Sequence, residues 1–270
     1  MRGPSRAALA EARQRLADAV TSAAEARTLG EELFAILGVL DEEAALRRAL
    51  TDGSRRAETR AELARRLFGD QVSDATMALL TGMCESRWSS PADLPAAVEE
   101  IAVTAFAAAA ERARHLDDLE DQLFRFGRVV MGTTELRTVL SNPTIPAQNK
   151  RQLLDTLLEG KVTADARQLI QEAAEHLRGR SVDMTLDHYA QWTAQWRQRL
   201  IAVARVAIPL TERLRERLIA ALEGAYRHEV HLDVIVDPRV EGGISVQIGD
   251  EFIDGSVASR LAVLRRRLAA

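Results

Sequence analysis

The stretch LFAILGVL, residues 33–40, decides the fold of the first part of the chain. Its apolar side chains recur at i, i+3, i+4 and i+7, which is the spacing of one helix face: Leu33, Ile36, Leu37 and Leu40. The stretch therefore predicts an amphipathic helix, and its surroundings, rich in Ala, Leu and Arg, favour further helices.

A second copy of this pattern lies 90 positions further along the chain. The Leu-Phe pair at 33–34 recurs at 123–124, and the Leu-Arg pair at 46–47 recurs at 136–137. Other matches at the same offset, without a gap, are Leu50 and Leu140, Leu63 and Leu153, Leu67 and Leu157, Val72 and Val162, Leu79 and Leu169, and Glu85 and Glu175. Since a repeat of this kind indicates a repeated structural unit, we predict two tandem helical bundles, residues 1–96 and 97–198, each of roughly five or six short helices.

The last part of the chain, residues 199–270, has a different pattern. A run rich in small and β-branched residues, 200–208, precedes a helix for which Thr211 is the expected N-cap. Residues 231–236 read as a strand, and residues 244–248 alternate apolar and polar side chains as a half-buried strand does. A two-residue hairpin signal, Gly249-Asp250, leads to Phe252-Ile253. We expect a small mixed sheet with helices, so the fold class is mainly α with a small α/β C-terminal domain.

Composition excludes several kinds of protein. The formal net charge of −4 argues against nucleic-acid binding, which needs a basic face. Cys84 is the only cysteine, so neither a disulfide within the chain nor a cysteine-rich zinc site is possible. The longest apolar stretch, residues 101–110, is too short for the ~20 residues of a membrane span, so we expect no transmembrane insertion.

The C-terminal segment EGGISVQIGDEFIDGSVASRL, residues 241–261, resembles the ATP synthase delta subunit family, which includes the oligomycin-sensitivity-conferring protein. Its motif residues, which we interpret as structural, are Gly242, Gly243, Gly249, Asp250, Asp254, Ser256 and Leu261. The second copy resembles the family's helical domain at residues 140–143 and at Lys150. Because short members have no place for the first copy, the whole chain resembles the long actinobacterial form. Glu241 and Arg227 depart from the family pattern.

The resemblance implies a non-catalytic stator subunit with no cofactor. It would link the alpha subunits of the catalytic head to the b subunit of the peripheral stalk, with one copy per complex at the cytoplasmic face of the bacterial cell membrane. The family places a groove for an alpha-subunit helix between the first and fifth helices of the second copy, so we expect partner contacts at Phe106, Ala109, Ala110 and Leu169. The alternative is a helical-repeat adaptor that binds an unrelated regulatory partner.

Other candidate sites have simpler explanations. His228 and His231 are three residues apart and lack the spacing of a zinc-protease helix, so we expect no metal there. The acidic group at residues 117–121 lacks the glycine of a calcium loop and suits a helix start. No histidine follows Ser256, so we expect this serine to cap a helix and not to act as a nucleophile. Trp192 and Trp196 fit either core packing or an interface.

Overall fold

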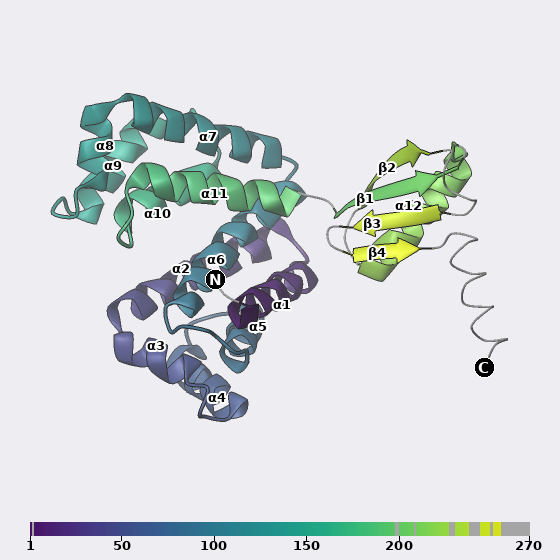
Figure 1. Ribbon diagram of the computed structural model, residues 1–270. Coiled ribbons are helices and arrows are strands. Elements are labelled where there is room, and N and C mark those ends of the chain that lie inside the picture. Colours follow the sequence, from purple (N-terminus) through teal and green to yellow (C-terminus); the bar gives the residue numbers. More distant parts are fainter. Residues whose placement is uncertain are drawn as a thin grey trace. The chain divides into compact units, whose positions relative to one another are not determined.

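Among the described residues up to 197, helices are the only regular elements. The computed structural model describes residues 1, 3–197, 200–207, 209–226, 230–237, 244–248 and 251–254. They belong to two units, residues 1–196 and residues 197–270, which are described separately below (Figure 1). The mainly α fold with a small α/β part is confirmed, and the second unit begins two residues before the predicted boundary at 199.

The helices of the first unit repeat at the offset seen in the sequence. Shifting α3, α4 and α5 by 90 residues reproduces the bounds of α8, α9 and α10. When α2 is shifted by the same amount, its last residue coincides with the last residue of α7. The helices are α1 (Gly3–Ala19), α2 (Ala23–Glu42), α3 (Ala44–Thr51), α4 (Ala57–Phe68), α5 (Asp74–Glu85), α6 (Asp93–Arg112), α7 (Leu116–Gly132), α8 (Thr134–Ser141), α9 (Ala147–Leu158), α10 (Ala164–Glu175) and α11 (Val182–Arg197).

Helix α6 belongs to both copies. At the same offset α1 falls on α6, and α6 falls on α11, so α6 closes the first copy and opens the second. Every residue from 97 to 110 is buried, including the polar residues Glu99, Glu100 and Thr104, so this helix is enclosed by the core on all sides. The predicted division after residue 96 falls in the first turns of this continuous helix, and both copies contribute to one hydrophobic core.

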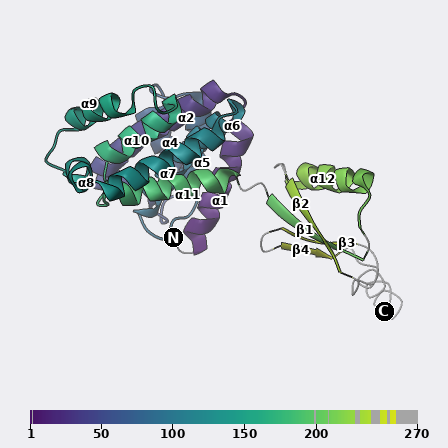
Figure 2. The same ribbon diagram turned by 90° about the horizontal axis from the view of Figure 1, so that it is seen from above.

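The most extensive helix contact in this core is between α2 and α6, which lie side by side in both views (Figures 1 and 2). Gly30 permits the approach, because a Cβ atom at this position would lie 2.7 Å from Cε2 of Phe106. Phe34 stacks on Phe106 with ring centroids 6.0 Å apart, and it also meets Tyr189 of α11 at 6.4 Å. The first copy therefore packs directly against the second.

Buried cations occupy equivalent positions in the two copies. Arg60 of α4 donates to the carbonyls of Cys84 and Glu85 at 2.8 and 2.9 Å, at the end of α5. Lys150, 90 positions later in α9, donates to the carbonyl of Ala174 at 2.9 Å, at the end of α10. Each cation satisfies helix-terminal carbonyls that have no partner within their own helix.

The N-caps of α5 and α10 are also held in the same way. The side chain of Glu32 accepts from the backbone N–H of Ser73 at 3.0 Å. Its counterpart Gln122 accepts from the backbone N–H of Thr163 at 2.8 Å. Since these contacts recur at an offset of 90, the duplication extends from the helix bounds to individual hydrogen bonds.

The second unit contains a four-stranded mixed sheet of order β2-β1-β3-β4. Strands β1 (Leu200–Val206) and β2 (Val230–Val236) are parallel and are connected through α12 (Glu212–Tyr226). Strand β3 (Ile244–Ile248) pairs antiparallel with β1 and with β4 (Glu251–Asp254). Ala204, Leu222 and Val246 form the centre of its core. The predicted strands at 231–236 and 244–248 and the antiparallel partner at 252–253 are confirmed.

Candidate functional site

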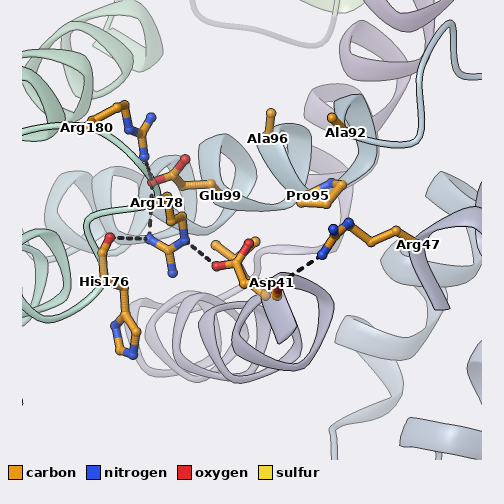
Figure 3. A pocket seen from close by; sticks show the side chains of 10 residues that line it. Asp41, Arg47, Ala92, Pro95, Ala96, Glu99, His176, Arg178 and Arg180 are labelled. Carbon is orange, nitrogen blue, oxygen red and sulfur yellow. Dashed lines mark hydrogen bonds and ion pairs between the residues drawn. The ribbon is translucent and has the colours of Figure 1, made fainter. Parts of the chain in front are cut away.

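A cluster of charged residues joins the two copies at a pocket with a volume of about 560 Å³ (Figure 3). At its centre is Arg178, in the connection between α10 and α11. Its Nε donates to Asp41 of α2 at 2.7 Å, and its terminal nitrogens donate to Glu99 of α6 at 3.2 Å and to Glu172 of α10 at 2.6 Å. One guanidinium thus ties three helices together, which suits its planar fork of donors.

Arg178 is held in the cluster at a backbone cost. It has φ of +49°, in the left-handed region that non-glycine residues seldom adopt, and the next residue, Gly179, has φ of +74°. Burial disfavours the charge of Arg178, but Tyr189, Glu172 and Glu99 act against that effect and raise the pKa of its guanidinium. These surrounding groups therefore keep the guanidinium charged in its buried position.

Glu99 is the carboxylate of the cluster that accepts hydrogen bonds from the most side chains. Besides Arg178, it accepts hydrogen bonds from Arg180 and from the hydroxyl of Tyr189, the latter at 3.1 Å. Burial raises the pKa of Tyr189. Because the carboxylates of the pocket are engaged in ion pairs between helices, the arrangement is suited to holding the copies together and offers no activated nucleophile for catalysis.

A second ion-pair group crosses between the copies. Arg27 of α2 makes a two-point contact with Asp165 of α10, at 2.5 and 2.9 Å. Nε2 of His115 lies 2.8 Å from the same carboxylate. Burial acts to raise the pKa of Asp165, but the hydrogen bonds from Arg27 and His115 outweigh it, and the net pKa is lowered. Asp165 is therefore held as an anion between the two copies.

The structure places the four predicted partner-contact residues in the interior. Phe106, Ala109, Ala110 and Leu169 are all completely buried in the common core. Their contact with an alpha-subunit helix stays a prediction, and in this structure none of the four side chains lines an open groove. The reason is the first copy: α2 covers α6, with Phe34 stacked on the ring of Phe106.

Most of the C-terminal motif lies outside the described residues. This is true of Gly242, Gly243, Gly249, Asp250, Ser256 and Leu261, and of His228. Asp254 is the last residue of β4 and pairs in register with Ser245 of β3. The turn conformation and the helix cap expected for this segment stay predictions.

Trp192 and Trp196 are half-buried against the core of the first unit. The ring of Trp192 lies 5.9 Å from that of Tyr189, and the indole N–H of Trp196 donates to Glu111 at 3.0 Å. These contacts support the core-packing interpretation.

The sequence analysis missed the residues that join the copies. Arg178, Glu99 and the Arg27–Asp165 pair have no local motif, because apart from Glu172 the partners that join the copies come from helices distant in sequence. Lys150 had a usable signal: it is one of only two lysines in an arginine-rich chain, and it lies 90 positions after Arg60.

Cys84 is buried, which raises the pKa of its thiol to about 12 and makes it a poor nucleophile.

Two further searches concern the described part of the chain. It contains no group of three or more His, Cys, Asp or Glu side chains placed to hold a metal ion. No helix among the described residues is long and apolar enough to cross a membrane.

Comparison with known proteins gives the family. A family model described as ATP synthase delta (OSCP) subunit matches residues 102–268, more than half of the chain. The chain belongs to the ATP synthase delta (OSCP) subunit family. It is 46% identical to ATP synthase subunit delta of Streptomyces griseus subsp. griseus and 42% identical to that of Thermobifida fusca, and each comparison covers 100% of both chains.

The extent of these matches agrees with the duplication. The delta (OSCP) family model begins inside α6 and leaves out α1 to α5, whereas the two full-length relatives also include the first copy. The predicted resemblance to the long form of the family is thereby confirmed. As a delta-family protein, the chain is a structural, non-catalytic component of the peripheral stalk.

Proposed function

We propose that the chain ties the catalytic head of a bacterial F-type ATP synthase to its peripheral stalk. The first unit binds alpha subunits of the head, and the α/β unit holds the end of the b subunit. One copy serves each complex, at the cytoplasmic face of the membrane. The observation that carries the proposal is the similarity, over the whole chain, to proteins named ATP synthase subunit delta.

The construction of the first unit supports this role. A stator must resist the torque of the rotating central stalk, and it therefore needs a body that does not bend between its attachment points. Sharing α6 between the copies replaces a linker with a continuous helix. The Arg27–Asp165 pair and the Arg178 cluster brace the copies near the two ends of α2, at Arg27 and at Asp41.

The test is affinity purification of the tagged full-length chain from membranes of a bacterium whose own delta subunit it replaces. We expect the alpha and b subunits to be recovered with it, and ATP-driven proton pumping to be retained. Recovery of an unrelated regulatory protein, with neither alpha nor b, would instead establish the adaptor alternative.

A variant in the α/β unit tests which unit holds the stalk. Gly249→Val should strain the turn between β3 and β4, by about 1–3 kcal/mol if the glycine has φ > 0. We expect less b subunit, an unchanged recovery of alpha, and a lower melting temperature of the α/β unit. A loss of b without a change in melting temperature would show that Gly249 contacts the partner directly.

A further inference from the structure

A groove opens on the second copy between α7, α8 and α9. Its volume is about 430 Å³, within the range of sites that accept ligand groups. Its apolar lining consists of Phe126, Val129, Leu136, Leu157, Leu158 and Val162. Val129 and Leu157 are 52% and 36% exposed, although both are large apolar side chains. Solvent-exposed apolar side chains around a groove indicate a surface that binds a partner.

The first copy carries the same apolar surface. Shifting the six lining positions back by 90 gives Ile36, Val39, Leu46, Leu67, Phe68 and Val72, all apolar. The two side chains that are exposed on the second copy have exposed counterparts here, Val39 at 41% and Leu67 at 42%. Apolar character is therefore common to both copies and cannot distinguish their partners.

The polar positions around the groove do distinguish them. Arg125 and Lys161 line the groove of the second copy, where the first copy has Ala35 and Gln71. Gln122 stands where the first copy has Glu32. The remaining polar position is acidic in both copies, Asp121 in the second and Glu31 in the first. Every change of charge between the copies makes the second copy more positive, so its groove favours an acidic partner.

Both cations of the groove are available to a carboxylate. Nζ of Lys161 donates to the carbonyl of Leu157 at 2.9 Å, and an ammonium has three donors, so two remain. The side chain of Arg125 is 76% exposed, and its Nε contacts Asp121 at 2.9 Å, which leaves its other nitrogens toward solvent.

The groove is also formed in advance. The side-chain oxygen of Gln122 accepts from both the N–H and the hydroxyl of Thr163, at 2.8 and 3.0 Å, and this fixes α7 to the start of α10. A preformed site saves the partner the cost of ordering it.

We propose that this groove binds an acidic amphipathic helix of a protein partner. Apolar side chains at i, i+3 or i+4, and i+7 enter the groove between Val129 and Leu157, as in other helix-in-groove complexes. Asp or Glu side chains beside that stripe pair with Arg125 and Lys161. The inference goes beyond the stator role, because it assigns a surface and a charge preference without naming the complex that supplies the helix.

The binding test uses the full-length chain and two designed fluorescent peptides. Both carry the same leucine stripe on a helix, with glutamates beside the stripe in one peptide and lysines in the other. By fluorescence anisotropy, we expect the glutamate peptide to bind at least about tenfold more tightly, which corresponds to 1.4 kcal/mol. Equal affinities, or no binding of the glutamate peptide, would overturn the proposal.

Matched variants locate the site on one copy. The double variant Val129→Gln with Leu157→Gln should bind the glutamate peptide about tenfold or more weakly than the wild type does. Val39→Gln with Leu67→Gln, the same changes on the first copy, should leave its affinity unchanged. All four side chains are exposed, and unchanged melting temperatures will show that the fold is kept. If the first-copy pair weakens binding as much as the second-copy pair, the assigned groove is wrong.

Charge reversal tests the electrostatic part. Arg125→Glu with Lys161→Glu should reverse the preference, so that the lysine peptide binds more tightly than the glutamate peptide. Added salt should reduce the difference between the peptides in both proteins, because these charges are exposed and screened. An unchanged preference in the double variant would contradict the proposed pairing.

Discussion

Three pairs of helices have the same bounds in the two helical copies, yet side chains at equivalent positions have different environments. Phe34 of α2 is 6% exposed and stacks on Phe106, whereas its counterpart Phe124 of α7 is 62% exposed. The face of α2 that carries Phe34 is covered by α6 and α11, which belong to the second copy. A repeat position therefore specifies a helix, and its neighbours in space decide whether a side chain on that helix is buried.

The charged residues show a complementary case. Arg60 and Lys150 differ chemically, and both are buried because each faces the end of its own fifth helix. Environments made within one copy recur in the other, whereas environments made between copies do not. Arg27 and Asp165, which link the copies, have the unrelated counterparts Asp117 and Ala75.

The largest difference between the copies is expected for the two phenylalanines. Phe34→Ala removes a stacked ring from the common core and should lower the free energy of unfolding by about 3–5 kcal/mol. Phe124→Ala removes a mostly exposed ring and should change it by less than about 0.5 kcal/mol. Urea unfolding followed by circular dichroism measures both. Similar losses in the two variants would show that Phe124 is buried in solution.

A smaller difference is expected for the buried cations. Arg60→Met leaves five carbonyl contacts unmade and should cost about 3–4 kcal/mol, while Lys150→Met leaves two and should cost about 2 kcal/mol. Arg60→Lys, which gives the first copy the residue of the second, should fall between wild type and Arg60→Met. The same urea experiment measures these variants. If Lys150→Met costs more than Arg60→Met, the number of hydrogen bonds does not set the order.

The smallest effect is expected at the ion pair between the copies, and it depends on pH. Asp165→Asn should cost about 1–3 kcal/mol at pH 7, where the carboxylate is charged and hydrogen bonded. The folded pKa of Asp165 is lowered, so its stabilisation is present above the unfolded pKa of about 3.9 and is lost as pH falls through the folded value.

The check is the melting temperature of wild type and Asp165→Asn between pH 7 and pH 2. The two curves should converge at the acidic end. Asp74→Asn, a change at an exposed first-turn aspartate of α5, is the control and should show no comparable convergence. A constant difference at every pH would mean that Asp165 acts through its shape and not through its charge.

Periodicity and local chemistry in the sequence determined the order and type of the elements. A helix face needs apolar side chains at a fixed spacing, and a half-buried strand needs alternation, so the helical copies, strands β2 to β4 and the 90-residue repeat were all predictable. The family was likewise predictable from the segment at residues 241–261, because its glycines, aspartates and apolar alternation are local.

Only the tertiary structure decided which helix faces are covered. From spacing alone, Phe106, Ala109 and Ala110 fit a groove as well as a core, and α2 of the first copy puts them in the core. The same holds for Arg178, whose partners come from α2, α6 and α10. The physical reason is that burial and ion pairing depend on residues far apart in the chain. The ion pairs of Arg178 with Asp41 and Glu99, and of Arg27 with Asp165, span 79 to 138 positions, and no local pattern records them.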